Sequence, residues 1–466
     1  MADEVKDHCG VFAIHGDDEA AYTAYLGLYA LQHRGEESCG IVTSNGKKFI
    51  SHKGMGHVQD VFVPKVLKGF SGHSAIGHVR YSTTGSSNIK NAQPLHVDYS
   101  KGEVAIAHNG NLTNADLLRS TLEAYGAIFQ TTTDSEIIIH LMAKPALNSI
   151  REGIVDALKR IEGAYSLVFL THDYIAAARD PQGFRPLWIG KTPAGAWVFA
   201  SETCALDLID AELIREVEPG ELVIANKDGL ISEKINTGKQ HAHCIFEHVY
   251  FSRPDSVIFD ESVHAVRKKF GQQLAREHAV DADVVIAVPD SGNSAALGYS
   301  QESGIPLEIG IIRNHYVGRT FIQPEQQQRN FKVKIKFNLL KDVLKGKRVV
   351  VVDDSIVRGT TSKLRIKTLR EAGAKEVHLR ISCPPHKFPC AYGIDFPTAS
   401  ELLASTKTLD EIRDYLECDT LGYLSLDGML DSVKKDKSEY CTACWSGQYP
   451  LAFDAPNKYF AENITN

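Results

Sequence analysis

The stretch RVVVVDDSIVRGTTS, residues 348–362, indicates the fold of the second half of the chain. Four consecutive valines are typical of a parallel strand that is buried on both faces. Asp353 and Asp354 follow at the carboxyl end of this predicted strand, which is where open α/β sheets bind ligands. Residues 355–361 then form a turn into the predicted helix SKLRIKTLREAG (362–373), whose first N–H groups could hold a phosphate.

The turn also carries the side chains that an anionic sugar ligand needs. Its side-chain donors are hydroxyl groups and one guanidinium, and one glycine allows the backbone to approach a ligand closely. These residues are Ser355, Arg358, Gly359, Thr360, Thr361 and Ser362. The adjacent carboxylates could accept hydrogen bonds from sugar hydroxyls and lie near Mg²⁺, which prefers hard oxygen ligands. An ordinary strand–helix turn with Asp and Ser caps is the alternative, and the length of the whole string favours the ligand site.

Outward from this stretch, the second half alternates strands and helices. The segments DVVIAVP (283–289), LEIGII (307–312) and EVHLRISCPP (376–385) are continuous apolar runs, and helical patterns lie between several of them. This alternation predicts an α/β domain with a mostly parallel sheet. The polar, turn-rich segment 226–240 separates it from the first half, and we place the boundary between residues 230 and 231.

The first half, residues 9–230, has a different pattern. Short apolar runs are broken by Gly, Asn and Thr, which predicts antiparallel strands and turns. Helical patterns occur near Ala20–Gln32 and at Ser135–Met142. We therefore expect an α+β domain here.

Composition excludes several function classes. The 466-residue chain has a net charge of -7, which argues against a general nucleic-acid-binding role. No apolar stretch approaches the ~18 residues of a membrane helix, and the start lacks a secretory pattern. We expect a cytoplasmic protein that binds neither nucleic acid nor membrane. Nine cysteines in such a protein are expected to be buried thiols, metal ligands or nucleophiles rather than disulfides.

Cys9, in MADEVKDHCGVFAIHG (1–16), raises the question of a nucleophile. A buried apolar thiol is the simpler interpretation, but candidate partners occur along the first half. They are a cation, an amide followed by a glycine, a carboxylate and a turn after a helix: Arg80, Asn109, Gly110, Asp134, Arg34 and Gly35. A side-chain amide next to a backbone N–H suits a developing oxyanion. Taken alone, each motif is weak: HNG is more often a hairpin turn than an oxyanion site, and TTTD is more often a helix cap.

Four further cysteines could form one metal site. Cys441 and Cys444 form a CxxC pair, and Cys244 and Cys390 lie earlier in the chain. Four thiolates can hold zinc or an iron–sulfur cluster, and a CxxC pair can also be redox-active or inert. The spacing alone leaves these alternatives open.

The string at 348–362 closely resembles the signature of the type I phosphoribosyltransferases. The resemblance implies that the turn holds the 5′-phosphate of phosphoribosylpyrophosphate (PRPP). It implies that Asp353 and Asp354 hold the ribose hydroxyls and, with Ser291, the Mg²⁺ ion. An earlier loop is expected to contact the pyrophosphate, and the matching residues are Asp290, Ser291, Gly292 and Asn293.

The long polar segment 313–338 lies between these two motifs. Lys332, Lys334 and Lys336 alternate along it, and Arg319 precedes them. One interpretation is a solvated edge strand protected by lysines. The other is a cover that folds over the anionic substrate.

The motifs of the first half resemble, in order and spacing, the N-terminal-nucleophile (class II) glutamine amidotransferases. This resemblance implies an αββα sandwich, a propeptide at residues 1–8, and Cys9 as a nucleophile whose freed α-amine is the base. Arg80 and Asp134 are then expected to bind the carboxylate and amine of glutamine, with Arg34 and Gly35 beside them. Asn109 and Gly110 are expected to form the oxyanion hole. Glu36 and Cys39 depart from the usual Gln and Ala.

The two motif sets in this order resemble the glutamine phosphoribosylpyrophosphate amidotransferases. That family releases ammonia from glutamine and transfers it to PRPP, giving 5-phosphoribosylamine, pyrophosphate and glutamate, the first committed step of purine synthesis. The resemblance also implies a homotetramer, purine nucleotide inhibitors, and a [4Fe–4S] cluster on Cys244, Cys390, Cys441 and Cys444. Cys39, Cys204, Cys383 and Cys418 are expected to be structural. The alternative is a PRPP-binding regulator that keeps the fold without catalysis, although no DNA-binding segment is evident.

Overall fold

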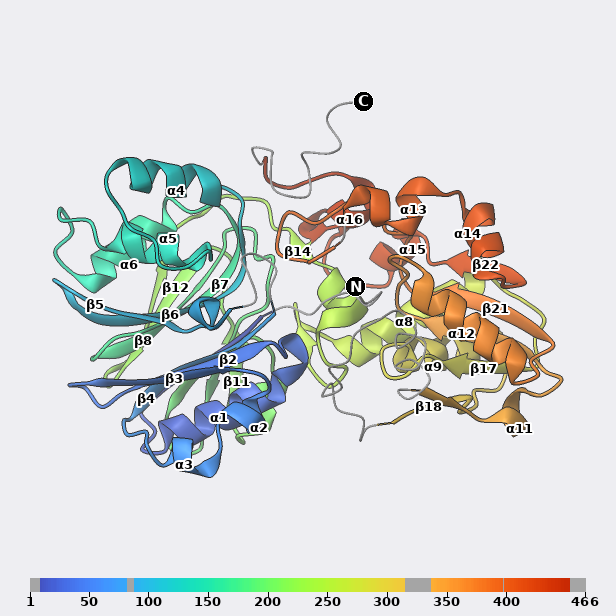
Figure 1. Ribbon diagram of the computed structural model, residues 1–466, viewed down its shortest axis with the longest axis horizontal. Helices are drawn as coiled ribbons and strands as arrows, with labels where there is room; N and C mark the ends of the chain where they lie inside the picture. Colours follow the sequence, from blue (N-terminus) through green and yellow to red (C-terminus); the bar gives the residue numbers. More distant parts are fainter. Residues whose placement is uncertain (1–8, 82–87, 315–336, 397, 453–466) are drawn as a thin grey trace.

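The computed structural model describes residues 9–81, 88–314, 337–396 and 398–452, and it has two halves that lie side by side (Figure 1). The propeptide prediction for residues 1–8, and the predictions for Arg319, Lys332, Lys334 and Lys336, lie outside these residues. Within the described ranges, none of the helices has the length and apolar character needed to cross a bilayer.

The first half contains two stacked antiparallel sheets. One has seven strands in the order β11-β9-β10-β1-β4-β2-β3, and the other has six in the order β13-β12-β8-β7-β6-β5. The strands are β1 (Gly10–His15), β2 (Ser38–Ser44), β3 (Phe49–Met55), β4 (Ser74–Arg80), β5 (Leu95–Tyr99), β6 (Gly102–Leu112), β7 (Gly163–Leu170), β8 (Tyr174–Arg179), β9 (Trp188–Lys191), β10 (Trp197–Ala200), β11 (Glu212–Glu216), β12 (Glu221–Asn226) and β13 (Gly229–Lys234).

Helices cover the outer faces of both sheets, which gives four layers (Figure 1). The helices are α1 (Ala20–Ala30), α2 (Val58–Val61), α3 (Pro64–Leu67), α4 (Ala115–Ala124), α5 (Ser135–Met142), α6 (Ile150–Leu158) and α7 (Cys204–Asp207). β1 lies between two cores, and this explains why residues 11–14 are all apolar. Val11 and Ala13 enter the core between the sheets, whereas Phe12 and Ile14 enter the core under α1. The predicted αββα sandwich is confirmed.

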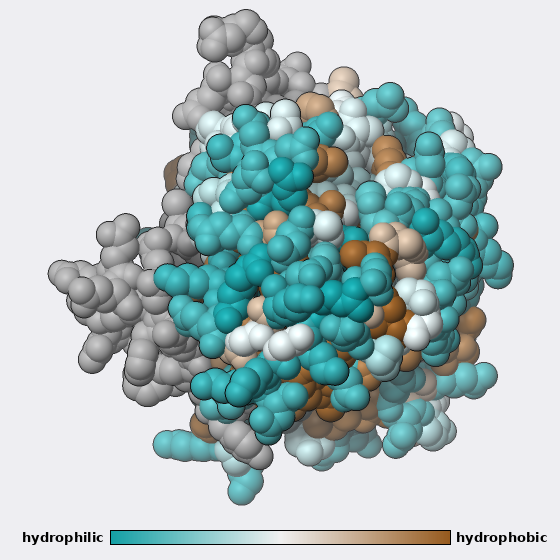
Figure 2. Space-filling model, turned by 90° about the vertical axis from the view of Figure 1, so that its right-hand side faces the viewer, coloured by the Kyte–Doolittle hydropathy of each residue, from teal (hydrophilic) through white to brown (hydrophobic). Residues whose placement is uncertain are grey.

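The second half is built on a parallel sheet in the order β17-β20-β21-β22. Its strands are β17 (Val284–Ala287), β20 (Arg348–Asp353), β21 (Glu376–Ile381) and β22 (Thr420–Tyr423). The helices of this half are α8 (Val263–Glu277), α9 (Asn293–Ser303), α11 (Lys341–Leu344), α12 (Thr360–Glu371), α13 (Leu403–Thr406), α14 (Leu409–Leu416), α15 (Leu426–Asp431) and α16 (Ala443–Ser446). Figure 2 shows the far end of this half, where hydrophilic residues cover most of the face. The predicted α/β domain is confirmed.

Two details differ from the sequence prediction. The run LEIGII does not form one continuous buried strand: Leu307 makes a single parallel bridge to Val285, and Ile311–Arg313 forms β18, which pairs antiparallel with β19 (Phe337–Leu339). Ile309 is accordingly 67% exposed. The boundary predicted at residue 230 falls inside β13, which pairs with β12, so the first half extends through Lys234.

Segments from the C-terminal part of the chain pack between the two halves. β14 (His243–Cys244) pairs parallel with β23 (Tyr440–Cys441), although nearly 200 residues separate them in sequence. A small apolar cluster joins Ala164 and Phe184 of the first half to Ala391 and Tyr392. Short elements complete the chain: the single-turn helices η1 (Gln32–Arg34), η2 (Ile89–Asn91), η3 (Glu247–Phe251), η4 (Ala399–Glu401) and η5 (Lys437–Glu439), and the strands β15 (Val257–Ile258) and β16 (Glu261–Ser262).

Candidate active site

Cys9 lies directly before β1, and its carbonyl oxygen accepts a hydrogen bond from Arg34, which pairs with Glu247 of the second half. Its thiol is buried, and Sγ lies 3.6 Å from the carbonyl oxygen of Tyr81, to which it donates. Burial raises the pKa of the Cys9 thiol, and the Arg80 guanidinium acts in the opposite direction. A thiol in this setting needs an adjacent base before it can act as a nucleophile.

Asn109 on β6 carries an unsatisfied amide. The residue is fully buried, and neither Oδ1 nor Nδ2 has a hydrogen-bond partner within the described residues. A buried unpaired donor costs ~1–3 kcal/mol, so such groups need an explanation. The next residue, Gly110, has a φ of 148°, and a Cβ there would lie 2.0 Å from the Ala164 carbonyl oxygen. Only glycine fits, and the backbone N–H and the amide remain side by side on one strand.

Arg80 and Asp134 bring opposite charges to the same site. Arg80 ends β4, which pairs with β1, and its Nη1 lies 2.9 Å from Oε1 of Glu37. Asp134 precedes α5 and accepts from the Leu112 N–H at 2.9 Å. Burial opposes ionisation of Asp134, but His108 and this hydrogen bond prevail and lower its pKa. Both charges are close enough to act on the Cys9 thiol.

Arg34 is held in a buried ion-pair network. Its guanidinium is fully buried and forms ion pairs with Glu202 and Glu247, the latter at 2.7 Å. These carboxylates raise the pKa of Arg34 despite its burial. The Arg34 side chain is therefore not free to bind glutamine, and its Nε instead donates to the Cys9 carbonyl oxygen at 3.2 Å. Arg34 is a positioning residue for the start of β1.

Gly35 follows Arg34 and supports Arg80. A Cβ on Gly35 would lie 2.6 Å from the backbone nitrogen of Arg80, so the two backbones can touch only at a glycine. The η1 turn thus fixes both Cys9 and Arg80. Because the Arg34 side chain is engaged and Gly35 has none, these two residues could contact a ligand only through their backbone groups.

The second site lies at the carboxyl end of β20. Asp353 ends the strand, Asp354 follows, and both are buried. Burial and the neighbouring Asp353 carboxylate raise the pKa of Asp354 to about 7, whereas hydrogen bonds from Ser291 and Ser355 oppose this. Arg365 Nη1 lies 2.5 Å from Oδ2 of Asp353. Two adjacent buried carboxylates repel each other, which suits a divalent cation or a set of sugar hydroxyls.

The turn after these carboxylates has the geometry expected of a phosphate cradle. Gly359, with φ of 78°, precedes α12, whose first residues are Thr360 and Thr361. Ser362 is buried at the same helix start, and Arg358 forms a 3.2 Å ion pair with Glu401. The first N–H groups of α12 and the adjacent hydroxyls are thus presented together.

The loop after β17 lies beside this turn. Gly292 allows the loop to approach β20, because a Cβ there would lie 2.4 Å from the Val352 carbonyl oxygen. Ser291 hydrogen-bonds to Asp354, and Asn293 begins α9. Asp290 lies 2.6 Å from Arg313 Nη1 and is half exposed. The structure therefore brings together both predicted PRPP motifs.

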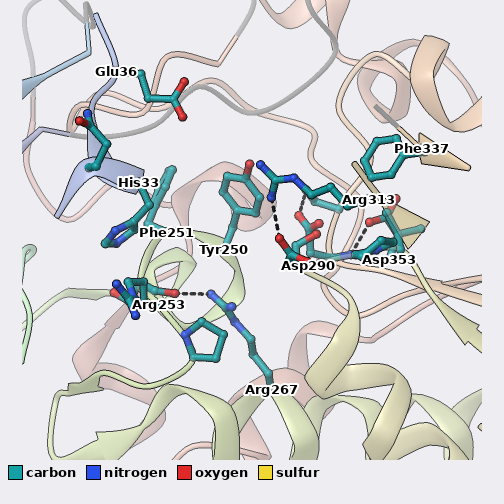
Figure 3. Close-up of a pocket in the computed structure, with 18 of the residues that line it drawn as sticks. His33, Glu36, Tyr250, Phe251, Arg253, Arg267, Asp290, Arg313, Phe337 and Asp353 are labelled. Atoms are coloured by element: carbon teal, nitrogen blue, oxygen red, sulfur yellow. Dashed lines mark hydrogen bonds and ion pairs between the residues drawn. The ribbon is translucent and has the colours of Figure 1, made fainter. Parts of the chain in front are cut away.

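A cavity of about 790 Å³ contains these acidic residues and reaches the first half (Figure 3). Asp290 and Asp353 lie on one side of it, and His33 and Glu36 lie on the other. His33 belongs to the same η1 turn whose Arg34 contacts Cys9. One helical turn therefore lies between the cavity and the backbone of Cys9.

Sequence reasoning missed several residues of this cavity. They are cationic or aromatic side chains from segments outside the motifs: Tyr250, Phe251, Arg253, Arg267, Arg313 and Arg365. Arg267 is buried and donates to the carbonyl oxygens of His248 and Ser252. The sequence offered one signal for this residue: an arginine occupies a position on the apolar face of the α8 pattern, where a charged side chain is unusual.

The four cysteines converge between the halves. Cys244 and Cys441 are register partners of β14 and β23, and each thiol in the group acts electrostatically on others of the group. Within the described residues, no three of these sulfurs lie within 4.8 Å of one another. Ligands of a single zinc ion, at ~2.3 Å from the metal, would be closer together.

The surroundings of these thiols suit a negatively charged group. The Arg185 guanidinium is fully buried, acts on Cys244 and Cys390, and donates to the Tyr392 carbonyl oxygen at 2.8 Å. The Tyr392 N–H donates to Cys390 Sγ at 3.3 Å. Hydrogen bonds to sulfur are typical of iron–sulfur ligation. The four thiols, with a buried cation and an N–H beside them, could hold a thiolate-bound metal group.

Comparisons with known proteins agree with this geometry. The sequence pattern of the glutamine amidotransferase domain matches residues 78–208, and that of the phosphoribosyl transferase domain matches residues 260–387. Amidophosphoribosyltransferase 2, chloroplastic, of Arabidopsis thaliana is 51% identical over 96% of this chain and 80% of its own length. The amidophosphoribosyltransferase of Bacillus subtilis is 48% identical, over 97% of this chain and 96% of its own.

Solved structures cover nearly the whole chain as well. One, described as the allosteric regulatory enzyme of purine biosynthesis, is 47% identical with a TM-score of 0.92, over 96% of this chain and 97% of its own. Another is the glutamine PRPP amidotransferase of B. subtilis complexed with ADP and GMP, with a TM-score of 0.90, 47% identity, and coverage of 95% and 97%. Fold, motifs and relatives agree, and the chain belongs to the amidophosphoribosyltransferases, which are glutamine-dependent pentosyltransferases.

Proposed function

We propose that Cys9 is the glutaminase nucleophile and that it works only after the His8–Cys9 bond is cut. An amide nitrogen cannot accept a proton, whereas the freed α-amine of Cys9 can take the thiol proton. The sulfur then attacks the carboxamide carbon of glutamine. The C–N bond breaks as the α-ammonium group of Cys9 gives its proton to the leaving nitrogen, which departs as ammonia. Water cleaves the resulting thioester, which gives glutamate and restores the thiol.

The single observation that carries this proposal is the orphaned Asn109 amide. Asn109 and Gly110 are consecutive residues of β6, and Nδ2 of Asn109 has no partner among the described residues. They are suited to hold the oxyanion that forms when sulfur attacks. A regulator that kept the fold without catalysis would have no use for such a costly group.

Charge positions the glutamine. Asp134, held ionised, would pair with the α-ammonium group. Arg80, whose guanidinium already contacts Glu37, would pair with the α-carboxylate. Arg34 and Gly35 would contribute through their backbone and by fixing the start of β1.

In the second half, we assign PRPP to the cavity next to β20. The turn at residues 355–362 would hold the 5′-phosphate, Asp353 and Asp354 the ribose hydroxyls, and the loop at 290–293 the pyrophosphate. Asp353, Asp354 and Ser291 would hold Mg²⁺ together with the substrate, and the bound ion would supply positive charge next to the pyrophosphate. Ammonia forms the C1–N bond, the C1–O bond to pyrophosphate breaks, and the nitrogen loses a proton.

Ammonia would pass from one site to the other inside the protein. The η1 turn contacts Cys9 on one side and lines the cavity on the other, so the route is short. Enclosure keeps ammonia from being protonated in water before it reaches C1. We place the reaction at the start of purine synthesis.

We also propose that Cys244, Cys390, Cys441 and Cys444 hold a [4Fe–4S] cluster with a structural role. The buried Arg185 charge and the Tyr392 N–H support this assignment. Purine nucleotides are proposed inhibitors, since the B. subtilis relative is complexed with ADP and GMP. The homotetramer and the cytoplasmic location stay predictions.

The deciding experiment compares the intact enzyme with Cys9→Ala. We expect processed protein to release pyrophosphate from PRPP with either glutamine or ammonia, and Cys9→Ala to use ammonia alone. N-terminal sequencing should begin at Cys9; a chain that still carries residues 1–8 and hydrolyses glutamine contradicts the proposal. Iron and acid-labile sulfide, each near four per chain, would support the cluster, and stoichiometric zinc at the thiols would contradict it.

A further inference from the structure

Two histidines and a glutamate meet beside β14, outside both sites described above. His241 and His243 come from the segment that links the halves, and Glu439 comes from the C-terminal part. The parallel pairing of β14 with β23 sets His243 opposite Tyr440, which brings Glu439 alongside. His241 Nδ1 lies 3.2 Å from Glu439 Oε2, and one ligand atom from each of the three residues lies within 4.8 Å of the others.

His243 is held by partners that leave one ring nitrogen available. Its ring is buried, stacks on Phe259 at 4.6 Å, and its Nδ1 lies 2.8 Å from the Gly183 carbonyl oxygen. When Nδ1 carries the proton and donates to Gly183, the lone pair is on Nε2. Histidines that bind metals usually have such a partner on the other ring nitrogen.

The surrounding charges allow a cation to bind. Arg179 and Lys435 both face His243. Arg179 pairs with Glu216 at 3.2 Å, and Lys435 pairs with Asp260 at 2.8 Å, so each positive charge is already compensated. The side chains of His241 and Glu439 are 42% and 35% exposed, which leaves the group open to solvent on one side.

We propose that His241, His243 and Glu439 bind a divalent transition-metal ion of the zinc class. Two imidazoles and one carboxylate match the ligand preferences of Zn²⁺, and three protein ligands leave a position for water. The site is separate from the thiol group, because Cys244 follows His243 on a strand where successive side chains point to opposite faces. The ion would fasten the segment bearing Cys441 to β14.

The test uses the whole protein and Co²⁺ as a spectroscopic probe that Zn²⁺ can displace. We expect one Co²⁺ per chain, with visible d–d bands but without the intense near-ultraviolet band that thiolate ligation gives. His241→Asn and Glu439→Gln should weaken binding more than about tenfold. His96→Asn, which removes an imidazole 3.1 Å from Glu103 and outside this group, should leave binding unchanged.

A second measurement separates lost binding from lost folding. His241 is partly exposed, so His241→Asn should unfold at the same temperature as the parent protein without metal. Zn²⁺ should raise that temperature in the parent and in His96→Asn but not in His241→Asn. Absence of saturable binding, a thiolate charge-transfer band, or equal binding by His241→Asn would each overturn the proposal.

Discussion

Replacing Asn109 with alanine should weaken catalysis and stabilise the fold at once. The amide has no partner among the described residues, so its removal relieves a desolvation cost of ~1–3 kcal/mol. A single truncation typically costs about 1 kcal/mol of packing. The free energy of unfolding should therefore rise by about 1 kcal/mol. Loss of one oxyanion donor should lower the glutamine-dependent kcat about 10²- to 10³-fold.

Three assays on one preparation test this reasoning. Pyrophosphate release is followed with glutamine and then with ammonia, and urea unfolding gives the stability. Only the glutamine-dependent rate should fall, because the PRPP cavity does not include Asn109. Asn111→Ala is the matched control on the same strand: its Nδ2 donates to the Ala391 carbonyl oxygen at 2.9 Å, so this variant should lose stability.

Two results would refute the argument. Glutamine-dependent activity within a few-fold of the parent would mean that the amide does not contact the reacting oxygen. Equal loss of ammonia-dependent activity would mean that the change disturbs the second half, so that the orphaned amide had a structural rather than a catalytic origin.

Three other predictions follow from buried groups. The raised pKa of Asp354, about 7, lies above its unfolded value of ~3.9, so the metal-free protein should lose stability as pH rises from about 4 through 7, and urea unfolding of Asp354→Asn should lack this dependence. Arg34→Met should cost ~3–5 kcal/mol of unfolding free energy because two buried glutamates lose their partner, whereas Arg413→Met, at an exposed ion pair, should leave the unfolding free energy nearly unchanged. Gly35→Ala should raise KM for glutamine and leave the ammonia-dependent rate intact, since its Cβ would displace Arg80; unchanged steady-state kinetics would disprove the contact.

Local chemistry made part of the structure predictable. The strand β20, its two carboxylates and the start of α12 follow from one continuous stretch, because burial, turn and helix start are adjacent in sequence. The helix α5 also has the predicted bounds, because the residues that start it and its apolar residues are adjacent in sequence. The orphaned amide of Asn109 could not be predicted, since it depends on what other strands leave unpaired.

Long-range contacts explain the errors. The run LEIGII has the composition of one continuous strand, but Leu307 makes only a single bridge to Val285, and Ile311–Arg313 pairs with a separate short strand. β2 is fully buried, yet it contains Ser, Cys, Gly and Thr, so its sequence does not show the apolar pattern of a buried strand. Arg34 sits in a motif typical of ligand binding, and its two carboxylate partners come from residues 202 and 247.

The contact between the Asn109–Asn111 strand and residues 391–393 has a consequence for the order of synthesis. Gly393 approaches the Gly110 carbonyl carbon so closely that a Cβ would lie 3.2 Å from it. The ribosome makes Cys9 first and these residues nearly 400 positions later. A nascent chain therefore lacks this contact with the proposed oxyanion site until β17, β20 and β21 have been made, so the first half is completed only when most of the second half has left the ribosome.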